Sequence, residues 1–131
     1  MSAKQLLEKH AEELGAIAGL RIEVIEQGNR IFVLIHDYQL PHGVSSVEKT
    51  DVVFVTDFQY PFSAMDMFWT DIAVVRPNGS LYEGSEAIEE YLGRKWRRFS
   101  YHRNNIWNPS GNPLLDHFAF MEGRWTGKAT R

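Results

Sequence analysis

The sequence predicts a single α+β domain with an N-terminal helix, a four-stranded antiparallel meander, an irregular loop and a C-terminal helix. Three observations predict it. The apolar spacing changes from three and four residues to two after Gly19, four apolar segments are separated by turn residues, and residues 94–112 follow neither period. At 131 residues the chain has the length of one domain, so we expect residues 1–131 to fold as one unit.

The first half of the chain is expected to hold one helix and four strands. The helix covers residues 4–18 and ends at Gly19, a natural C-cap. Its apolar face consists of Leu6, Leu7, His10, Ala11, Leu14 and Ala18. Residues 21–26 and 30–36 alternate around Gly28-Asn29 and predict a hairpin, and residues 50–58 and 65–75 predict the third and fourth strands.

The second half is expected to begin with a turn at residues 76–79 and a short helix over residues 86–92, capped by Ser85 and ended by Gly93. Residues 94–112 predict a long irregular loop, which is uncommon in a compact domain unless it is functional. Asn112 and Pro113 then open a last helix. Its apolar face consists of Leu114, Phe118, Met121 and Trp125.

Composition excludes several classes of protein. The chain is 44% hydrophobic and 24% charged, which is typical of a soluble globular domain, and its charged N-terminus resembles neither a signal peptide nor a membrane span. We therefore expect a cytoplasmic protein without a membrane partner. A net charge of −3 argues against nucleic acid as the partner, although a basic cluster suits a protein or an anionic group. The cluster is Arg94, Lys95, Arg97, Arg98 and Arg103.

Three segments carry a family likeness. They are YPFSAMDMFW at residues 60–69, GRKWRRFSYHR at 93–103, and WNP at 107–109 followed by LLDH at 114–117. In this order they resemble the ubiquitin-conjugating superfamily, and more closely its prokaryotic family E. The resemblance implies a ubiquitin-conjugating-enzyme-like fold and a bacterial protein that works with an adenylating activating enzyme and a ubiquitin-like modifier. It also implies an isopeptidase of the same operon, and no cofactor.

In that superfamily a loop cysteine carries the modifier as a thioester, a few residues before the Trp-x-Pro motif. This chain has no cysteine, and the position seven residues before Trp107 is Ser100. Three interpretations stay open: Ser100 carries an oxyester, the protein is an inactive scaffold that binds the modifier or the activating enzyme, or a native cysteine has been replaced.

The catalytic interpretation assigns each candidate a role. Ser100 is the acceptor and His102, two residues on, is its base or orienting group. Oxyanion or tail binding is assigned to Arg97, Arg98, Arg103, Asn104 and Asn105. Asp66 is expected to pair with an arginine of residues 94–103, and Asp66 and Trp107 to anchor the loop.

The remaining histidines and tryptophans favour structural roles. His36 and His42 do not have the spacing of a metal site, so no metal is expected. His117 is expected at the core boundary. At least three of the four tryptophans are expected in the core.

Overall fold

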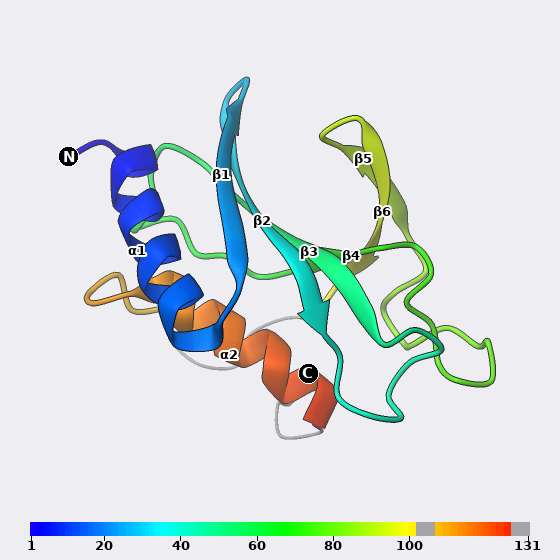
Figure 1. The fold of residues 1–131 in the computed structure, drawn as a ribbon. Helices are drawn as coiled ribbons and strands as arrows, with labels where there is room; N and C mark the ends of the chain where they lie inside the picture. Colours follow the sequence, from blue (N-terminus) through cyan, green and yellow to red (C-terminus); the bar gives the residue numbers. More distant parts are fainter. Residues whose placement is uncertain (102–106, 127–131) are drawn as a thin grey trace.

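Two helices cover one face of a twisted antiparallel sheet in the computed structural model, which describes residues 1–101 and 107–126 (Figure 1). The elements are α1 (Ala3–Ala18), β1 (Arg21–Gln27), β2 (Arg30–Gln39), β3 (Lys49–Thr56), β4 (Phe68–Thr70), β5 (Ile88–Tyr91), β6 (Arg94–Phe99) and α2 (Pro113–Thr126). Over the described residues the strand order is β1-β2-β3-β4-β6-β5. The α+β class is therefore confirmed, but the sheet has six strands and the prediction of four is wrong.

Helix α1 ends where its sequence signals predict. Ser2 and Gln5 form a capping box, in which the Ser2 side chain accepts from the Gln5 amide and the Gln5 side chain accepts from the Ser2 amide. Gly19 takes a left-handed conformation with φ of 69° and its N–H bonds to the Gly15 carbonyl. Leu7 and Leu14 are fully buried against the sheet.

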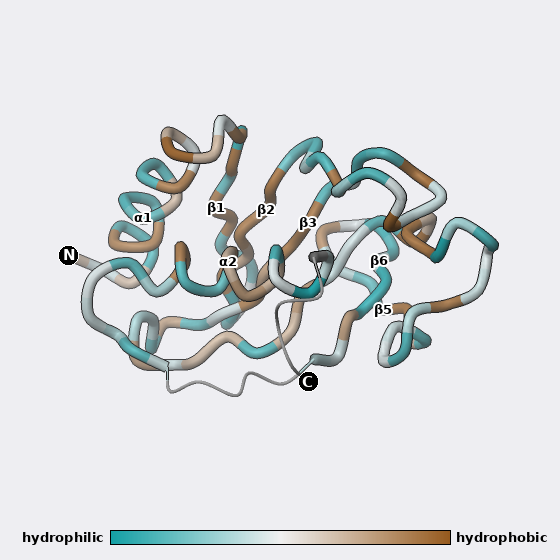
Figure 2. The backbone as a smooth tube through the Cα atoms, turned by 90° about the horizontal axis from the view of Figure 1, so that it is seen from below, coloured by the Kyte–Doolittle hydropathy of each residue, from teal (hydrophilic) through white to brown (hydrophobic). Residues whose placement is uncertain are grey.

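The predicted meander is present in β1, β2 and β3. The first hairpin pairs Gln27 with Arg30 around Gly28-Asn29, and β2 then pairs with β3. Apolar residues follow one another along β2 because both faces of the sheet are covered there (Figure 2). Ile31 and Val33 belong to the core between sheet and helices, whereas Phe32 belongs to a second, smaller core on the opposite face.

Strand β4 is shorter than predicted. It covers only Phe68–Thr70, not residues 65–75. The chain leaves the sheet at Asp71, and Val75 then offers its carbonyl to the Ser46 amide at 3.0 Å. Contacts with the 45–46 segment therefore replace sheet pairing after Thr70.

The predicted helix over residues 86–92 is wrong, because this segment forms β5 and the first half of a tight hairpin. Leu92 and Gly93 both have positive φ, at 55° and 74°, as a two-residue hairpin turn requires. Ser85 is fully buried and its hydroxyl donates to the Tyr82 carbonyl at 2.7 Å, so it stabilises a turn and does not cap a helix.

The predicted irregular loop is also wrong at its start, because Arg94–Phe99 forms β6. Trp96 and Phe99 are both fully buried, in the two different cores. Charged residues surround them, so β6 is largely hydrophilic and shows no simple alternation (Figure 2). The expected turn at residues 76–79 is confirmed by the Gly79 amide donating to the Arg76 carbonyl at 2.8 Å.

Helix α2 has the predicted start and buried face. The Asn112 side chain accepts from the Leu115 amide at 3.0 Å, which is N-cap geometry, and Pro113 follows at the first helical position. All four predicted apolar positions, Leu114, Phe118, Met121 and Trp125, are buried. No helix among the described residues is long and apolar enough to cross a bilayer.

Candidate functional site

The Tyr-Pro and Trp-Asn-Pro segments lie against each other. The indole N–H of Trp107 donates to the carbonyl of Pro61 at 2.7 Å, and the Tyr60–Pro61 peptide bond is cis. The bond joins the turn before β4 to the segment that leads into α2. Trp107 is thereby held beside the cis-proline turn, and its role as a loop anchor stays a prediction.

A buried polar junction holds the same turn to both helices. The Tyr60 hydroxyl lies 2.6 Å from Nδ1 of His10. Asn112 extends the junction by donating to the His10 carbonyl at 3.2 Å. His10 and Tyr60 are only 5% and 3% exposed, so the junction is shielded from water.

Burial also sets the protonation of this junction. It lowers the pKa of His10, more than the nearby Glu13 raises it, and it raises the pKa of the Tyr60 phenol. Both groups are therefore neutral near pH 7. We assign the hydroxyl hydrogen to the bond with His10, whose Nδ1 accepts, because a phenol is a more acidic donor than a neutral imidazole.

Ser100 lies directly after β6 and is half-buried. Its amide donates to the Gly84 carbonyl at 3.0 Å, which holds the residue beside the 82–85 turn. Phe99 and Tyr101 on either side are buried in the helix-side core with ring centroids 5.9 Å apart. In an extended segment the Ser100 side chain then faces away from that core, and within the described residues its hydroxyl makes no hydrogen bond.

The predicted partners of Ser100 are placed only in part. His102, Arg103, Asn104 and Asn105 lie outside the described residues, so their roles stay predictions.

Arg97 and Arg98 lie in β6 and already have partners. Arg97 donates to the carbonyls of Ile72 and Ser85 at 3.0 and 2.7 Å, and Arg98 pairs with Glu89 at 3.0 Å. These bonds tie the 71–87 connection and β5 to β6, and oxyanion or tail binding by the two arginines stays a prediction.

Arg94 forms a third charged contact, with two aspartates. It pairs with Asp51 at 2.9 Å and also with Asp71, while stacking 4.1 Å from the Trp96 ring. Burial acts to raise the pKa of Asp51, but the Asp37 amide and Arg94 outweigh it and the pKa is lowered. At Asp71 burial prevails and the pKa is raised, although Arg94 opposes it.

Asp66 is half-buried and precedes β4 instead of lying within a strand. The bonds described above for the β6 arginines go to other residues, and Arg103 lies outside the described residues. The pairing of Asp66 with an arginine of residues 94–103 stays a prediction.

Histidine and tryptophan positions correct and confirm other expectations. His117 is fully buried, not at the core boundary, and its Nε2 lies 2.9 Å from the Met67 carbonyl. Trp69, Trp96 and Trp125 are buried as expected. His36 contacts Glu23, and no group of three metal-binding side chains occurs among the described residues.

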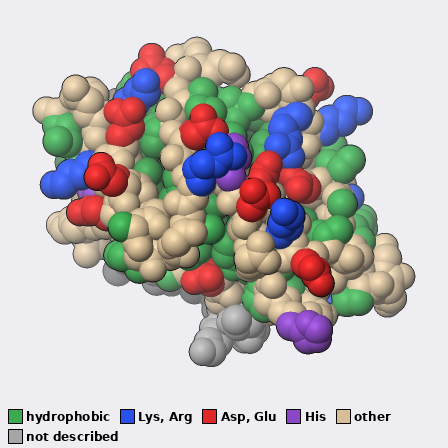
Figure 3. Space-filling view, viewed as in Figure 1, with side chains coloured by type: hydrophobic (Ala, Val, Ile, Leu, Met, Phe, Trp, Pro, Cys, Tyr) green, Lys and Arg blue, Asp and Glu red, His purple; other side chains and the backbone are tan. Residues whose placement is uncertain are grey.

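Basic and acidic side chains are interspersed on the face seen in Figure 3. On this face the basic side chains lie singly or in small groups beside acidic ones.

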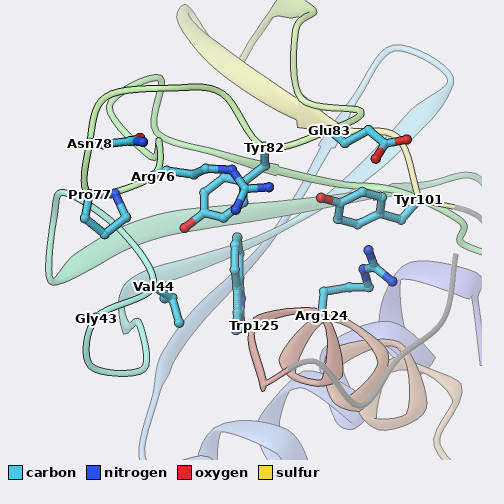
Figure 4. A pocket seen from close by; sticks show the side chains of 10 residues that line it. All are labelled: Gly43, Val44, Arg76, Pro77, Asn78, Tyr82, Glu83, Tyr101, Arg124 and Trp125. Carbon is cyan, nitrogen blue, oxygen red and sulfur yellow. The ribbon is translucent and has the colours of Figure 1, made fainter.

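A pocket that the sequence did not predict lies between residues 76–83 and the end of α2 (Figure 4). It is a cavity of about 620 Å³ lined by Gly43, Val44, Arg76, Pro77, Asn78, Tyr82, Glu83, Tyr101, Arg124 and Trp125. These residues come from four separate segments, and no spacing in the sequence links them. The only local signal was Arg76 in an exposed turn, which turn chemistry alone explains.

Comparison with known proteins gives one match. The family profile of prokaryotic E2 family E matches residues 6–126, nearly the whole chain. Neither the curated proteins nor the solved structures contain a match.

Proposed function

The chain belongs to prokaryotic E2 family E, and we propose that it carries a ubiquitin-like modifier on Ser100, as an oxyester, from an activating enzyme to an amine on a target. The family supports a ubiquitin-conjugating-like role and, with it, a modifier and an activating enzyme as partners. The serine chemistry and an isopeptidase partner go beyond what the family indicates.

The position of Ser100 carries the proposal. It follows β6 seven residues before Trp107, and Trp107 is held by the Pro61 carbonyl. Its own amide is held by the Gly84 carbonyl, so the backbone is fixed while the half-buried side chain has no hydrogen bond in the described part of the chain. A side chain that the fold positions but does not use is available for reaction.

The reaction requires two acyl transfers. The Ser100 hydroxyl attacks the carbonyl carbon of a modifier thioester on the activating enzyme, loses its proton to a base and expels the thiolate. A target amine then attacks the oxyester, forms the amide bond and returns a proton to the Ser100 oxygen. A serine hydroxyl needs a base at neutral pH, and His102 is the proposed base because it lies two residues on.

Intact-mass spectrometry tests the proposal directly. The chain is incubated with its activating enzyme, its modifier and ATP, and we expect a mass increase of one modifier minus water. Ser100→Ala should abolish the adduct, while Ser110→Ala, at an exposed position on the other side of Trp107, should leave it unchanged. An adduct that persists in Ser100→Ala would refute the assignment.

Ser100→Cys sharpens the test because it changes the bond and not the position. An oxyester resists thiol reductants, whereas the Cys variant should form an adduct that a reductant removes. A reductant-sensitive adduct in the wild-type chain would contradict the oxyester, because the chain has no cysteine.

The absence of cysteine favours a second candidate function, a non-covalent scaffold. In this alternative the chain binds the modifier or the activating enzyme and forms no covalent bond. Binding in the absence of any adduct, together with full pathway activity in Ser100→Ala, would establish it.

A further inference from the structure

The pocket beside residue 101 contains two arginines, each stacked on a tyrosine ring. Arg76 stacks 4.8 Å from the Tyr82 ring, and Arg124 stacks 3.9 Å from the Tyr101 ring (Figure 4). Among the described residues of the lining, Glu83 is the single acidic side chain, so Arg76 and Arg124 give this part of the lining a net positive charge in a chain whose net charge is −3. Stacking fixes a guanidinium by its face and orients its N–H edge for an anion.

Two buried groups in the same lining also need acceptors. The indole N–H of Trp125 and the hydroxyl of Tyr82 are shielded from solvent, and no described group bonds to either. Trp125 is 7% exposed and stands in the centre of the pocket (Figure 4). Burial raises the pKa of Tyr82, although Arg76 opposes it, so the phenol keeps its hydrogen and can donate. A buried donor without an acceptor is costly, and a ligand with acceptor oxygens would remove that cost.

The turn at one side of the pocket disfavours phosphate as the ligand. Phosphate sites usually present several free backbone amides. Here Pro77 has no N–H, the Gly79 amide donates to the Arg76 carbonyl, and the Ser80 amide donates to the Asn78 side chain. Recognition is left to side chains with one net positive charge, which suits a monoanion that accepts a planar pair of hydrogen bonds.

The pocket also adjoins the proposed acceptor position. Tyr101 follows Ser100 in the chain, and Glu83 precedes Gly84, whose carbonyl accepts from the Ser100 amide. The pocket therefore adjoins the Ser100 backbone, while the Ser100 side chain faces away from the core that contains Tyr101. Its volume of about 620 Å³ accommodates a side chain with the peptide backbone around it.

We propose that this pocket binds a carboxylate of the protein that accepts the modifier, with Arg76 and Arg124 as the charged contacts and Trp125 and Tyr82 as buried donors. The pocket is then a specificity site, and Arg76 is a positioning residue. That the carboxylate belongs to the acceptor protein rests on the proposed function, whereas carboxylate binding by the pocket does not.

Titration of the isolated chain with short peptides tests the binding. The NMR signal of the Trp125 indole N–H is the readout. Trp125→Phe assigns that signal. The probes are a blocked pentapeptide with a central glutamate, its glutamine counterpart, a peptide with a free C-terminal carboxylate as its only acid, and inorganic phosphate. We expect saturable shifts with the carboxylate peptides and none with glutamine. The stronger of the two carboxylate peptides identifies a side chain or a chain terminus as the source.

Arg76→Gln should weaken the binding of the carboxylate peptide about tenfold, which is the loss expected for one charge-assisted hydrogen bond. Arg30→Gln is the matched control, because Arg30 also stacks on a tyrosine, 5.5 Å from the Tyr91 ring, and lies in a distant hairpin. Equal effects of the two variants would overturn the proposal, as would equal binding of the glutamine peptide or binding of phosphate alone.

The binding test is independent of the chemistry at Ser100. Ser100→Ala should bind the carboxylate peptide like the wild-type chain, so loss of the adduct with intact binding refutes only the proposed function. If transfer is observed, Arg76→Gln should raise the KM for an acceptor peptide that carries a glutamate without lowering kcat. An unchanged KM would overturn the assignment to the acceptor.

Discussion

Tyr60→Phe is expected to destabilise the protein far more than the loss of one hydroxyl from a surface. The hydroxyl donates to Nδ1 of His10, and both residues are at most 5% exposed. Its removal leaves the His10 Nδ1 buried without this partner. A stranded buried group costs about 1–3 kcal/mol, so the free energy of unfolding should fall by about that amount.

Urea denaturation followed by tryptophan fluorescence measures this loss. For a chain of 131 residues the same loss should lower Tm by about 4–11 °C. Tyr91→Phe is the matched control, because the Tyr91 ring packs against Phe32 and Trp69 and its hydroxyl has no hydrogen bond in the described part of the chain. We expect that control to lie within about 0.5 kcal/mol of the wild type.

A double-mutant cycle isolates the hydroxyl–imidazole bond. His10→Leu removes the acceptor and keeps a side chain suited to a helix. If the bond is present, the double variant with Tyr60→Phe should be more stable than the sum of the single losses predicts, by about 1–2 kcal/mol. Strict additivity, or a Tyr60→Phe loss no larger than that of Tyr91→Phe, would refute the junction as we describe it.

Three further outcomes follow from the same contacts. Burial lowers the pKa of His10, so as the pH falls His10 is protonated in the unfolded chain before it is protonated in the folded chain. Stability should therefore fall as the pH drops below about 6.5 and level off below the folded pKa. In urea midpoints measured from pH 7.5 to 5, His10→Leu should remove this fall. Trp107→Phe deletes the bond to the Pro61 carbonyl and should cost about 1 kcal/mol in urea, with unchanged stability contradicting an anchoring role. Arg97→Met removes the bonds to the Ile72 and Ser85 carbonyls and should speed hydrogen exchange of the backbone amides across residues 71–87. Lys95→Met, at an exposed position of the same strand, should not. Equal exchange rates in the two variants would contradict the role of Arg97 in holding this segment.

The sequence predicted those elements whose signals are local. Helix α1 and the start of α2 depend on caps within a few residues, Ser2 with Gln5 and Asn112 with Leu115. The first hairpin depends on a two-residue turn between alternating segments. Each of these interactions forms between neighbours in the chain, so spacing alone identifies it.

Strands β5 and β6 could not be predicted because their stabilising interactions are distant. Residues 86–92 contain good helix formers, and their strand conformation depends on pairing with β6 and on the bond between Trp69 and Glu89 at 2.8 Å. In β6 the arginines occupy positions that a half-buried strand usually gives to apolar residues. Arg97 is accommodated there because two carbonyls from residues 72 and 85 accept its hydrogen bonds.

Ser100 and the pocket also differ in whether the sequence alone could identify them. Ser100 was identified by its offset from Trp107, which is a property of the chain, and the structure adds that its backbone is held by Gly84. The pocket is formed by residues from Gly43 to Trp125, so it appears only once the fold is known.

The missing cysteine bears on the chemistry of this chain but not on its scaffold. The bonds described above for the junction use Tyr60, His10 and Asn112, and the link between the two proline motifs uses only an indole and a carbonyl. None of these interactions would change if residue 100 carried a thiol. The fold can therefore accommodate either a hydroxyl or a thiol at that position, and Ser100→Cys becomes the decisive variant: a thiol-sensitive adduct in this variant alone would show that the scaffold is competent and that the serine is what limits the reaction.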